Sequence, residues 1–160
     1  MKFRCVDKIV AWTPFEHIAG VKAVSFEEYS LKEAFGDEAR LPETLLLESF
    51  FQLGNWLLLL STDFQQMGMV VRLTSAQFHG ALRPGQQLRL EVTLARRHAD
   101  GFEFTGEGRV GDRAIITGLG CLATPVPAAD YVNPDDLRVL FEEIFQPEAR
   151  AENLALLRQS

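Results

Sequence analysis

The longest apolar stretch of the chain lies between Leu45 and Leu60, and only a few polar side chains interrupt it. It follows Pro42 and Glu43, which favour a helix start, because the first turn needs no N–H from proline and is stabilised by negative charge. The pattern predicts one long helix. Since its apolar side chains point in almost every direction, we expect other elements to enclose it. The stretch is shorter than the roughly 20 apolar residues that span a bilayer, so no membrane span is expected.

The segments after this helix show the two-residue alternation of half-buried β-strands. From Leu88 to Leu94, apolar residues alternate with polar ones, and a similar pattern runs from Phe102 to Val110. Gly111 and Asp112 supply a two-residue hairpin turn, and an apolar strand returns over residues 114–123. Three further strands are expected, over Phe3 to Trp12, Ile18 to Phe26 and Met67 to Phe78.

This order of elements predicts an α+β fold in which an antiparallel sheet curls around a single helix, since that arrangement buries both the one-sided strands and the apolar helix. It is the hot-dog fold, and we expect it over residues 1–127. A helical extension over residues 128–160 should pack on the same domain. Its first helix would be capped by Asn133, with an apolar face made of Leu137, Leu140, Phe141 and Ile144, and a second amphipathic helix is predicted over 148–160.

Composition narrows the classes of function. With 160 residues the chain forms one domain, and its net charge of −6 repels phosphate backbones, so nucleic acid is not an expected partner. Cys5 and Cys121 stand alone, without the spacing of a disulfide framework or a zinc site. We therefore expect no metal and no cofactor. Charged residues interrupt the N-terminal apolar positions, which argues against a secretory signal and favours the cytoplasm.

The predicted helix carries one polar stripe. Thr44, Glu48 and Gln52 follow at intervals of four residues, and Asn55 continues the same face. A carboxyl group among leucines and phenylalanines loses hydration in its charged form, which makes Glu48 a candidate proton donor. The alternative is that Glu48 is a structural polar residue, at the surface or at a subunit contact.

Several segments are similar, in order and spacing, to the bacterial (3R)-hydroxyacyl-ACP dehydratases. Residues 3–10 (FRCVDKIV) resemble the opening strand of that family, and Val24-Ser25 falls at its second strand. Residues 42–52 (PETLLLESFFQ) resemble its helix, in which the catalytic glutamate is followed four residues later by glutamine. Ala76-x-Phe78, Pro84-Gly85 and Leu88 match a further pattern. The resemblance implies the hot-dog fold, with Glu48 as the catalytic acid and Gln52 as its neighbour.

Two departures weaken the implied chemistry. In the family, a histidine of one subunit removes the α-proton and the glutamic acid of the other protonates the departing hydroxyl. The Gly-His-Phe-Pro pattern that holds this histidine reads Glu33-Ala34-Phe35-Gly36 here, and the glycine that polarises the thioester carbonyl is replaced by Glu43. The substrate-binding positions implied by the resemblance are Ala34, Phe35, Glu43, Thr44 and Phe78.

Other side chains are weaker candidates. His17, His79 and His98 lie away from the family position, and we interpret them as surface or packing residues. Phenylalanines 50, 51, 102 and 104, together with Trp56, could line an acyl tunnel, although such residues more often form core. A group of arginines in the second half of the chain could attract an acidic carrier protein, although a solvated strand face explains them better.

Three hypotheses follow. The first is a dehydratase-like protein that binds or acts on a 3-hydroxyacyl thioester of ACP or CoA, with dehydration weakened or lost because Ala34 replaces the histidine. The second is an acyl thioesterase that uses Glu48. The third is a non-catalytic subunit that partners a histidine-bearing homologue. The expected assembly is a homodimer, with a higher oligomer or a heterodimer as alternatives.

Overall fold

One long helix, α2 (Glu43–Ser61), occupies the centre of the molecule, as the apolar run predicts. The computed structural model describes residues 4–27 and 39–147. Pro42 holds the N-cap position and Glu43 begins the first turn. By length and composition α2 could cross a membrane, but most of it is buried inside the protein. It is therefore the core helix of the fold.

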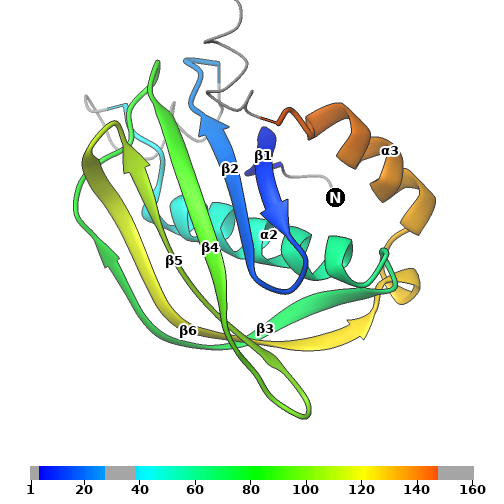
Figure 1. Cartoon of the computed structure of the whole chain (residues 1–160). Helices are drawn as coiled ribbons and strands as arrows, with labels where there is room; N and C mark the ends of the chain where they lie inside the picture. The colour runs from blue at the N-terminus through cyan, green and yellow to red at the C-terminus, as the bar shows by residue number, and fades with distance from the viewer. Residues whose placement is uncertain (1–3, 28–38, 148–160) are drawn as a thin grey trace, which may run out of the picture.

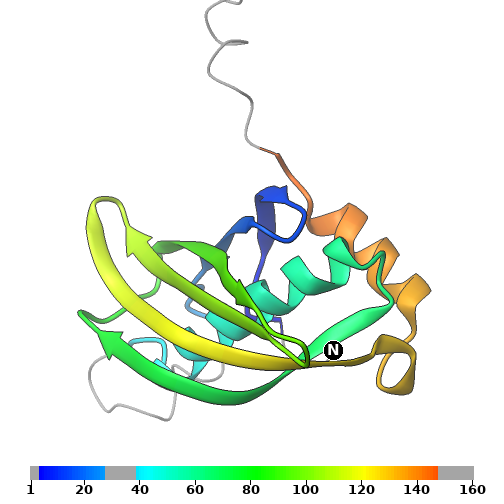
Figure 2. The same ribbon diagram turned by 60° about the horizontal axis from the view of Figure 1, so that its bottom comes forward.

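Within the described residues, six strands form one antiparallel sheet in the order β1-β2-β4-β5-β6-β3. Their bounds are β1 Lys8–Thr13, β2 His17–Ala23, β3 Gln66–Phe78, β4 Gln87–Arg97, β5 Phe102–Val110 and β6 Arg113–Pro127. The sheet curls around α2 (Figures 1 and 2). Leu88, Leu90 and Val92 of β4 are fully buried and alternate with more exposed residues, so one face of this strand forms core. The architecture confirms the predicted α+β hot-dog fold.

Phe50 of α2 packs on the sheet at a place where two glycines face it. A Cβ atom added to Gly118 would lie 3.0 Å from the Phe50 ring, and one added to Gly106 would lie 2.9 Å from it. Both distances are too short for a side chain, so glycine at these positions allows the helix to approach the sheet closely. Glu48 lies two residues before Phe50 on the same helix.

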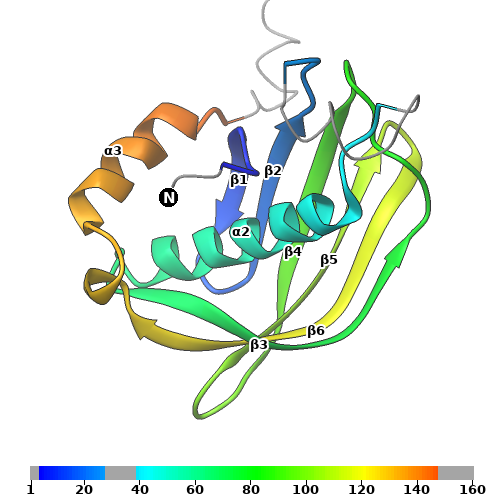
Figure 3. The ribbon, with the colours of Figure 1, turned by 180° about the vertical axis from the view of Figure 1, so that it is seen from behind.

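The residues after β6 form a short 3-10 helix, η1 (Ala128–Asp130), and the helix α3 (Pro134–Ile144). The Asn133 side chain accepts a hydrogen bond from the N–H of Asp135 at 3.0 Å, which confirms the predicted cap. The following backbone joins β1, where the N–H of Gln146 donates to the carbonyl of Ile9 at 2.9 Å. In Figures 1 and 3, α3 lies beside β1. The second helix predicted over 148–160 falls outside the described residues.

Some predicted boundaries were wrong. The first strand was expected from Phe3, but β1 begins at Lys8, because the N–H of Cys5 donates to a side chain of α2 and joins no strand. The second strand was expected to continue to Phe26 and ends at Ala23, where the chain turns toward the segment before β4 through a hydrogen bond from the N–H of Val24 to Gln86. The last strand runs to Pro127, beyond the predicted Ala123.

Candidate functional site

A pocket of about 300 Å³ opens between α2 and the start of β3. Glu48, Gln52 and Asn55, three residues of the predicted polar stripe on α2, line it. Its remaining walls consist of apolar side chains and of backbone. They are formed by Phe51 of α2 and by Met67, Gly68 and Val70 of β3. One helix face and one edge strand therefore form the site.

Glu48 is held by a chain of two hydrogen bonds. The Nε2 of Gln52 donates to the Oε1 of Glu48 at 2.8 Å, and the Oε1 of Gln52 accepts the backbone N–H of Cys5 at 2.9 Å. Because the Cys5 N–H can only donate, the amide of Gln52 must present its NH₂ group to Glu48. Gln52 is buried, whereas Glu48 is half-buried and lines the pocket. This arrangement fixes one carboxyl oxygen of Glu48, and within the described residues the other oxygen receives no hydrogen bond.

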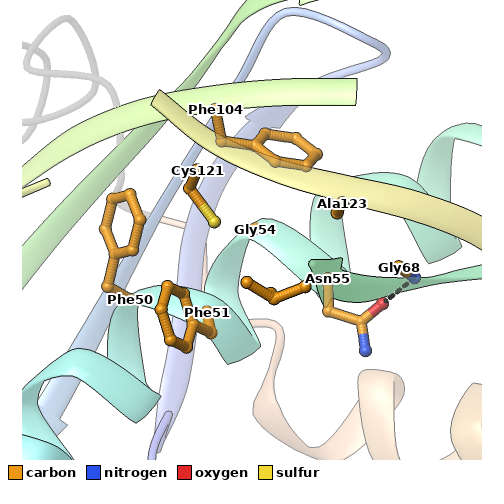
Figure 4. Close-up of a pocket in the computed structure, with 9 residues that line it drawn as sticks. Phe50, Phe51, Gly54, Asn55, Gly68, Phe104, Cys121 and Ala123 are labelled. Carbon is orange, nitrogen blue, oxygen red and sulfur yellow. Dashed lines mark hydrogen bonds between the residues drawn. The ribbon is translucent and has the colours of Figure 1, made fainter. Parts of the chain in front are cut away.

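A narrow crevice of about 10 Å³ adjoins the pocket, with room for about one water molecule. The two spaces share Phe51, Asn55, Gly68 and Val70. The crevice is otherwise lined by residues between helix and sheet, which Figure 4 shows as mostly apolar: Phe50, Gly54, Phe104, Cys121 and Ala123. Burial raises the pKa of the Cys121 thiol to about 11, so at neutral pH this wall carries a protonated thiol and no charge.

The other predicted site residues are placed differently. Thr44 and Glu43 are exposed at the start of α2 and do not line this pocket. Phe78 ends β3, where it pairs with the buried Ile116 of β6, and it is 37% exposed. Ala34 and Phe35 lie outside the described residues. Within this one chain, the structure therefore brings together Glu48 and Gln52 but not Thr44, Glu43 or Phe78.

All three histidines of the chain are paired elsewhere. His17 lies 3.5 Å from Glu91, and His98 lies 3.2 Å from Glu103, both on the sheet. The Nε2 of His79 is 3.0 Å from the hydroxyl of Thr117. No histidine lines the Glu48 pocket or its crevice. Among the described residues, the pocket thus holds an acid but no imidazole.

The aromatic residues considered for an acyl tunnel divide into two groups. Phe50, Phe51 and Phe104 line the crevice. Phe102 instead stacks on Phe15 at 6.2 Å between ring centroids, and Trp56 packs against α3. Of these aromatic residues, only Phe51 also lines the Glu48 pocket.

Several arginines proposed for carrier docking are already in contact with protein groups. Arg89 pairs with Glu91 at 3.1 Å on the same strand, and Arg109 pairs with Glu107 at 3.3 Å. The guanidinium of Arg97 lies 4.4 Å from the centre of the Phe15 ring. These contacts favour the solvated strand face over a dedicated docking surface.

Sequence reasoning missed the contributions of Cys5, Met67, Gly68 and Val70. The role of Cys5 is carried by its backbone N–H, which no pattern of side chains reveals. Gly68 and Val70 come from an expected strand, but nothing in its alternation shows which part of the strand meets α2. The residues that the structure describes contain no group of three or more metal-ligating side chains.

Comparison with solved structures agrees with the observed fold. A hypothetical thioesterase from Streptococcus pneumoniae TIGR4, solved with coenzyme A, superposes with a TM-score of 0.60 at 12% identity, over 75% of this chain and 88% of that chain. The Escherichia coli PaaI protein from the phenylacetic acid degradation operon gives a TM-score of 0.60 at 7% identity, over 75% and 80%. At these identities the likeness concerns the fold alone, and it is the hot-dog fold.

Sequence comparison defines the family. A family model described as FabA-like domain matches residues 1–118. The 3-hydroxyacyl-[acyl-carrier-protein] dehydratase FabZ of Caulobacter vibrioides (strain NA1000 / CB15N) is 30% identical over 114 residues, which cover 69% of this chain and 72% of that protein. The corresponding protein of Legionella pneumophila (strain Corby) is 29% identical over 134 residues, with coverage of 81% and 86%. The chain therefore belongs to the FabA-like family and is a FabZ-like hot-dog protein. The helix α3 lies beyond the matched domain.

Proposed function

We propose that this protein binds a 3-hydroxyacyl thioester, carried on ACP or CoA, in the pocket that Glu48 lines. The observation that carries the proposal is the Cys5–Gln52–Glu48 chain of hydrogen bonds, which holds a carboxyl group in a fixed orientation in the wall of the pocket. The relatives named 3-hydroxyacyl-[acyl-carrier-protein] dehydratase supply the substrate class. The acyl chain would lie against Phe51, Met67 and Val70, which line the pocket.

Dehydration of such a ligand breaks the Cα–H and Cβ–O bonds, forms a C=C bond and releases water. Protonated Glu48 is suited to deliver a proton to the departing hydroxyl through the oxygen that Gln52 does not occupy. The α-proton needs a base, and none of the chain's histidines lines the pocket. Ala34, at the position of the family's histidine, cannot accept a proton. We therefore propose that dehydration is weak or absent in a homodimer of this chain.

The test measures binding and turnover separately on the purified full chain. A 3-hydroxyacyl-pantetheine thioester should bind to the wild type and to Glu48→Gln, because glutamine preserves an oxygen acceptor for Gln52. Any slow formation of the enoyl thioester should fall by about 100-fold or more in Glu48→Gln, as expected for loss of a general acid. Absence of binding would refute the proposal, and rapid dehydration would refute the assigned loss of activity.

Thioester hydrolysis is a second candidate. The pocket is open to solvent, so Glu48 could take a proton from a water molecule as the water oxygen bonds to the thioester carbonyl carbon. The C–S bond then breaks, and the leaving thiolate takes up that proton. This route needs no imidazole, in agreement with the residues that line the pocket. Release of free CoA from acyl-CoA that disappears in Glu48→Gln would support hydrolysis, whereas unchanged release in that variant would exclude Glu48 as its catalyst.

The proposed assembly is a homodimer formed through β3. This strand borders the pocket and forms one edge of the sheet, and Met69 and Val71 on it are 45% and 56% exposed. Such an edge favours pairing with another strand. A histidine-bearing homologue could pair with the same edge and form a heterodimer, which native mass spectrometry of the protein from its source would detect. Cys5 and Cys121 are buried and form no disulfide within the described residues, which is compatible with the proposed cytoplasmic location.

A further inference from the structure

Asn55 lies where the open pocket meets the apolar crevice, and it lines both. It follows Glu48 by seven residues on α2, which is two helical turns on the same face. The position is half-buried, so a ligand can reach it. Neither the predicted acid chemistry nor the hydrogen-bond chain through Gln52 uses this side chain.

The orientation of the Asn55 amide is fixed by the sheet. Its Oδ1 accepts the backbone N–H of Gly68 at 2.8 Å. Since the Gly68 N–H can only donate, the atom facing it must be oxygen, and Nδ2 must point the other way. Figure 4 shows this arrangement, with the amide nitrogen turned away from Gly68. Across residues 4–27 and 39–147, the hydrogen bonds of the structure give Nδ2 no acceptor. A fixed and unused donor therefore lies at the site.

The distance from Glu48 decides what this donor can bind. Seven residues of helix correspond to about 10 Å along the axis. The 3-hydroxyl and the thioester carbonyl of one ligand are separated by only a few bonds, so a ligand whose hydroxyl meets Glu48 does not place its thioester carbonyl at Asn55. The donor therefore suits a second oxygen, further along the ligand.

We infer that Asn55 is a ligand-binding residue that donates through Nδ2 to a carbonyl or hydroxyl oxygen remote from the reacting carbons. This inference rests on the proposed function, because it requires an acyl thioester in the pocket. Two parts of such a ligand carry an oxygen of this kind. One is an oxygen-substituted acyl chain that lies in the larger pocket, and the other is the outer amide carbonyl of the pantetheine arm.

Two variants separate an effect on ligand binding from an effect on the stability of the fold. Asn55→Asp keeps an oxygen to accept the Gly68 N–H but removes the donor, whereas Asn55→Leu removes both. Asn55→Asp should therefore unfold at nearly the wild-type temperature, and Asn55→Leu at a lower one. Gln65→Asp is the matched control, since it adds the same charge at an exposed position outside both spaces.

Binding is measured by calorimetry with four probes. These are 3-hydroxyacyl-pantetheine thioesters with and without a keto group further along the chain, and the same two acyl groups on N-acetylcysteamine, which lacks the outer pantetheine amide. Loss of the donor should lower the affinity for the ligand that supplies the remote oxygen by about tenfold, relative to the affinity for the ligand that lacks this oxygen. Comparing ligands within one variant cancels the effect of the added charge.

The outcomes are distinct. A selective loss of affinity for the keto-substituted chains identifies the acyl chain as the source of the oxygen. A selective loss of affinity for the full pantetheine thioesters identifies the outer amide of the pantetheine arm as its source. If Asn55→Asp changes all four affinities equally or leaves them all unchanged, the inference is refuted while the proposed function stands. If wild-type protein binds none of the four probes, the proposed function itself fails.

Discussion

Gln52 is the residue on which the geometry of Glu48 depends. Replacement by leucine removes the acceptor of the Cys5 N–H and the donor to Glu48. Because a buried N–H without an acceptor is costly, the free energy of unfolding of Gln52→Leu should fall by about 1–3 kcal/mol. Chemical denaturation measures this change.

The control for this prediction is Gln87→Leu, on β4. Gln87 is exposed, so the same substitution there should change the free energy of unfolding by less than about 0.5 kcal/mol. Equal stability of Gln52→Leu and the wild type would show that the Cys5–Gln52 hydrogen bond contributes nothing, and that Glu48 is positioned in another way.

At the scale of single residues, the helical face of the candidate site could be predicted from the sequence, but the partners of that face could not. The four-residue spacing on a helix placed Glu48 and Gln52 on one face, because helical geometry is local. Their partners could not be found in this way. The N–H groups of Cys5 and Gly68 meet the helix only through the tertiary fold, and backbone donors leave no trace in residue type. For the same reason, the Phe102 expected at a tunnel packs on Phe15 instead.

At the scale of elements, α3 closes the side of the fold that lies beside β1. Phe141 is the centre of this contact, with ring centroids 6.2 Å from Trp56, 6.3 Å from Phe64 and 5.0 Å from Phe145. Arg138, on the same helix, donates to the carboxylate of Asp63 at 2.7 Å. Apolar packing should contribute more than this exposed ion pair, since surface salt bridges stabilise weakly.

Phe141→Ala should therefore lower the free energy of unfolding by about 2–4 kcal/mol, toward the lower end of the range for large-to-small substitutions because Phe141 is half-buried. Val139→Ala is the control on the same helix, where the side chain is 58% exposed, and little change is expected. Denaturation curves of both variants measure the difference. A loss in Phe141→Ala no larger than in Val139→Ala would mean that α3 does not stabilise the domain.

The elements differ in how well the sequence predicts them. The hairpin of β5 and β6 was predicted with its turn, because Gly111 adopts a positive φ of 56° that glycine tolerates, and this turn separates the alternating residues of β5 from the apolar run of β6. The start of β1 and the end of β2 were predicted wrongly, because apolar residues continue past the point where strand pairing stops. Whether an apolar residue belongs to a paired strand or only packs against the sheet depends on its neighbours in space.

At the scale of the whole molecule, the two edges of the sheet are unequal. The β1 edge is covered, since Phe145 bridges Ile9 and the N–H of Gln146 donates to the same residue. The β3 edge, 13 residues long, pairs only with β6 among the described strands. A long edge with exposed apolar side chains favours association, and a symmetric dimer lets identical strands pair antiparallel.

Antiparallel pairing along most of β3 would bring its two opposite ends together. Phe78 of the partner subunit would then approach Met67 and Gly68, which line the Glu48 pocket. Within one chain Phe78 is remote from that pocket, so its predicted role in substrate binding requires the dimer. Assembly and ligand binding should therefore be lost together.

The double variant Met69→Lys and Val71→Lys tests this link, because charges on an edge strand oppose strand pairing. Light scattering should give twice the chain mass of 18.0 kDa for the wild type and the mass of one chain for the variant. The variant should also bind the 3-hydroxyacyl thioester at least about tenfold more weakly. Val139→Lys, a charge on the exposed face of α3, should remain dimeric and retain its affinity. A monomeric wild type would refute the dimer, and a monomeric variant with full affinity would show that the pocket is complete within one chain.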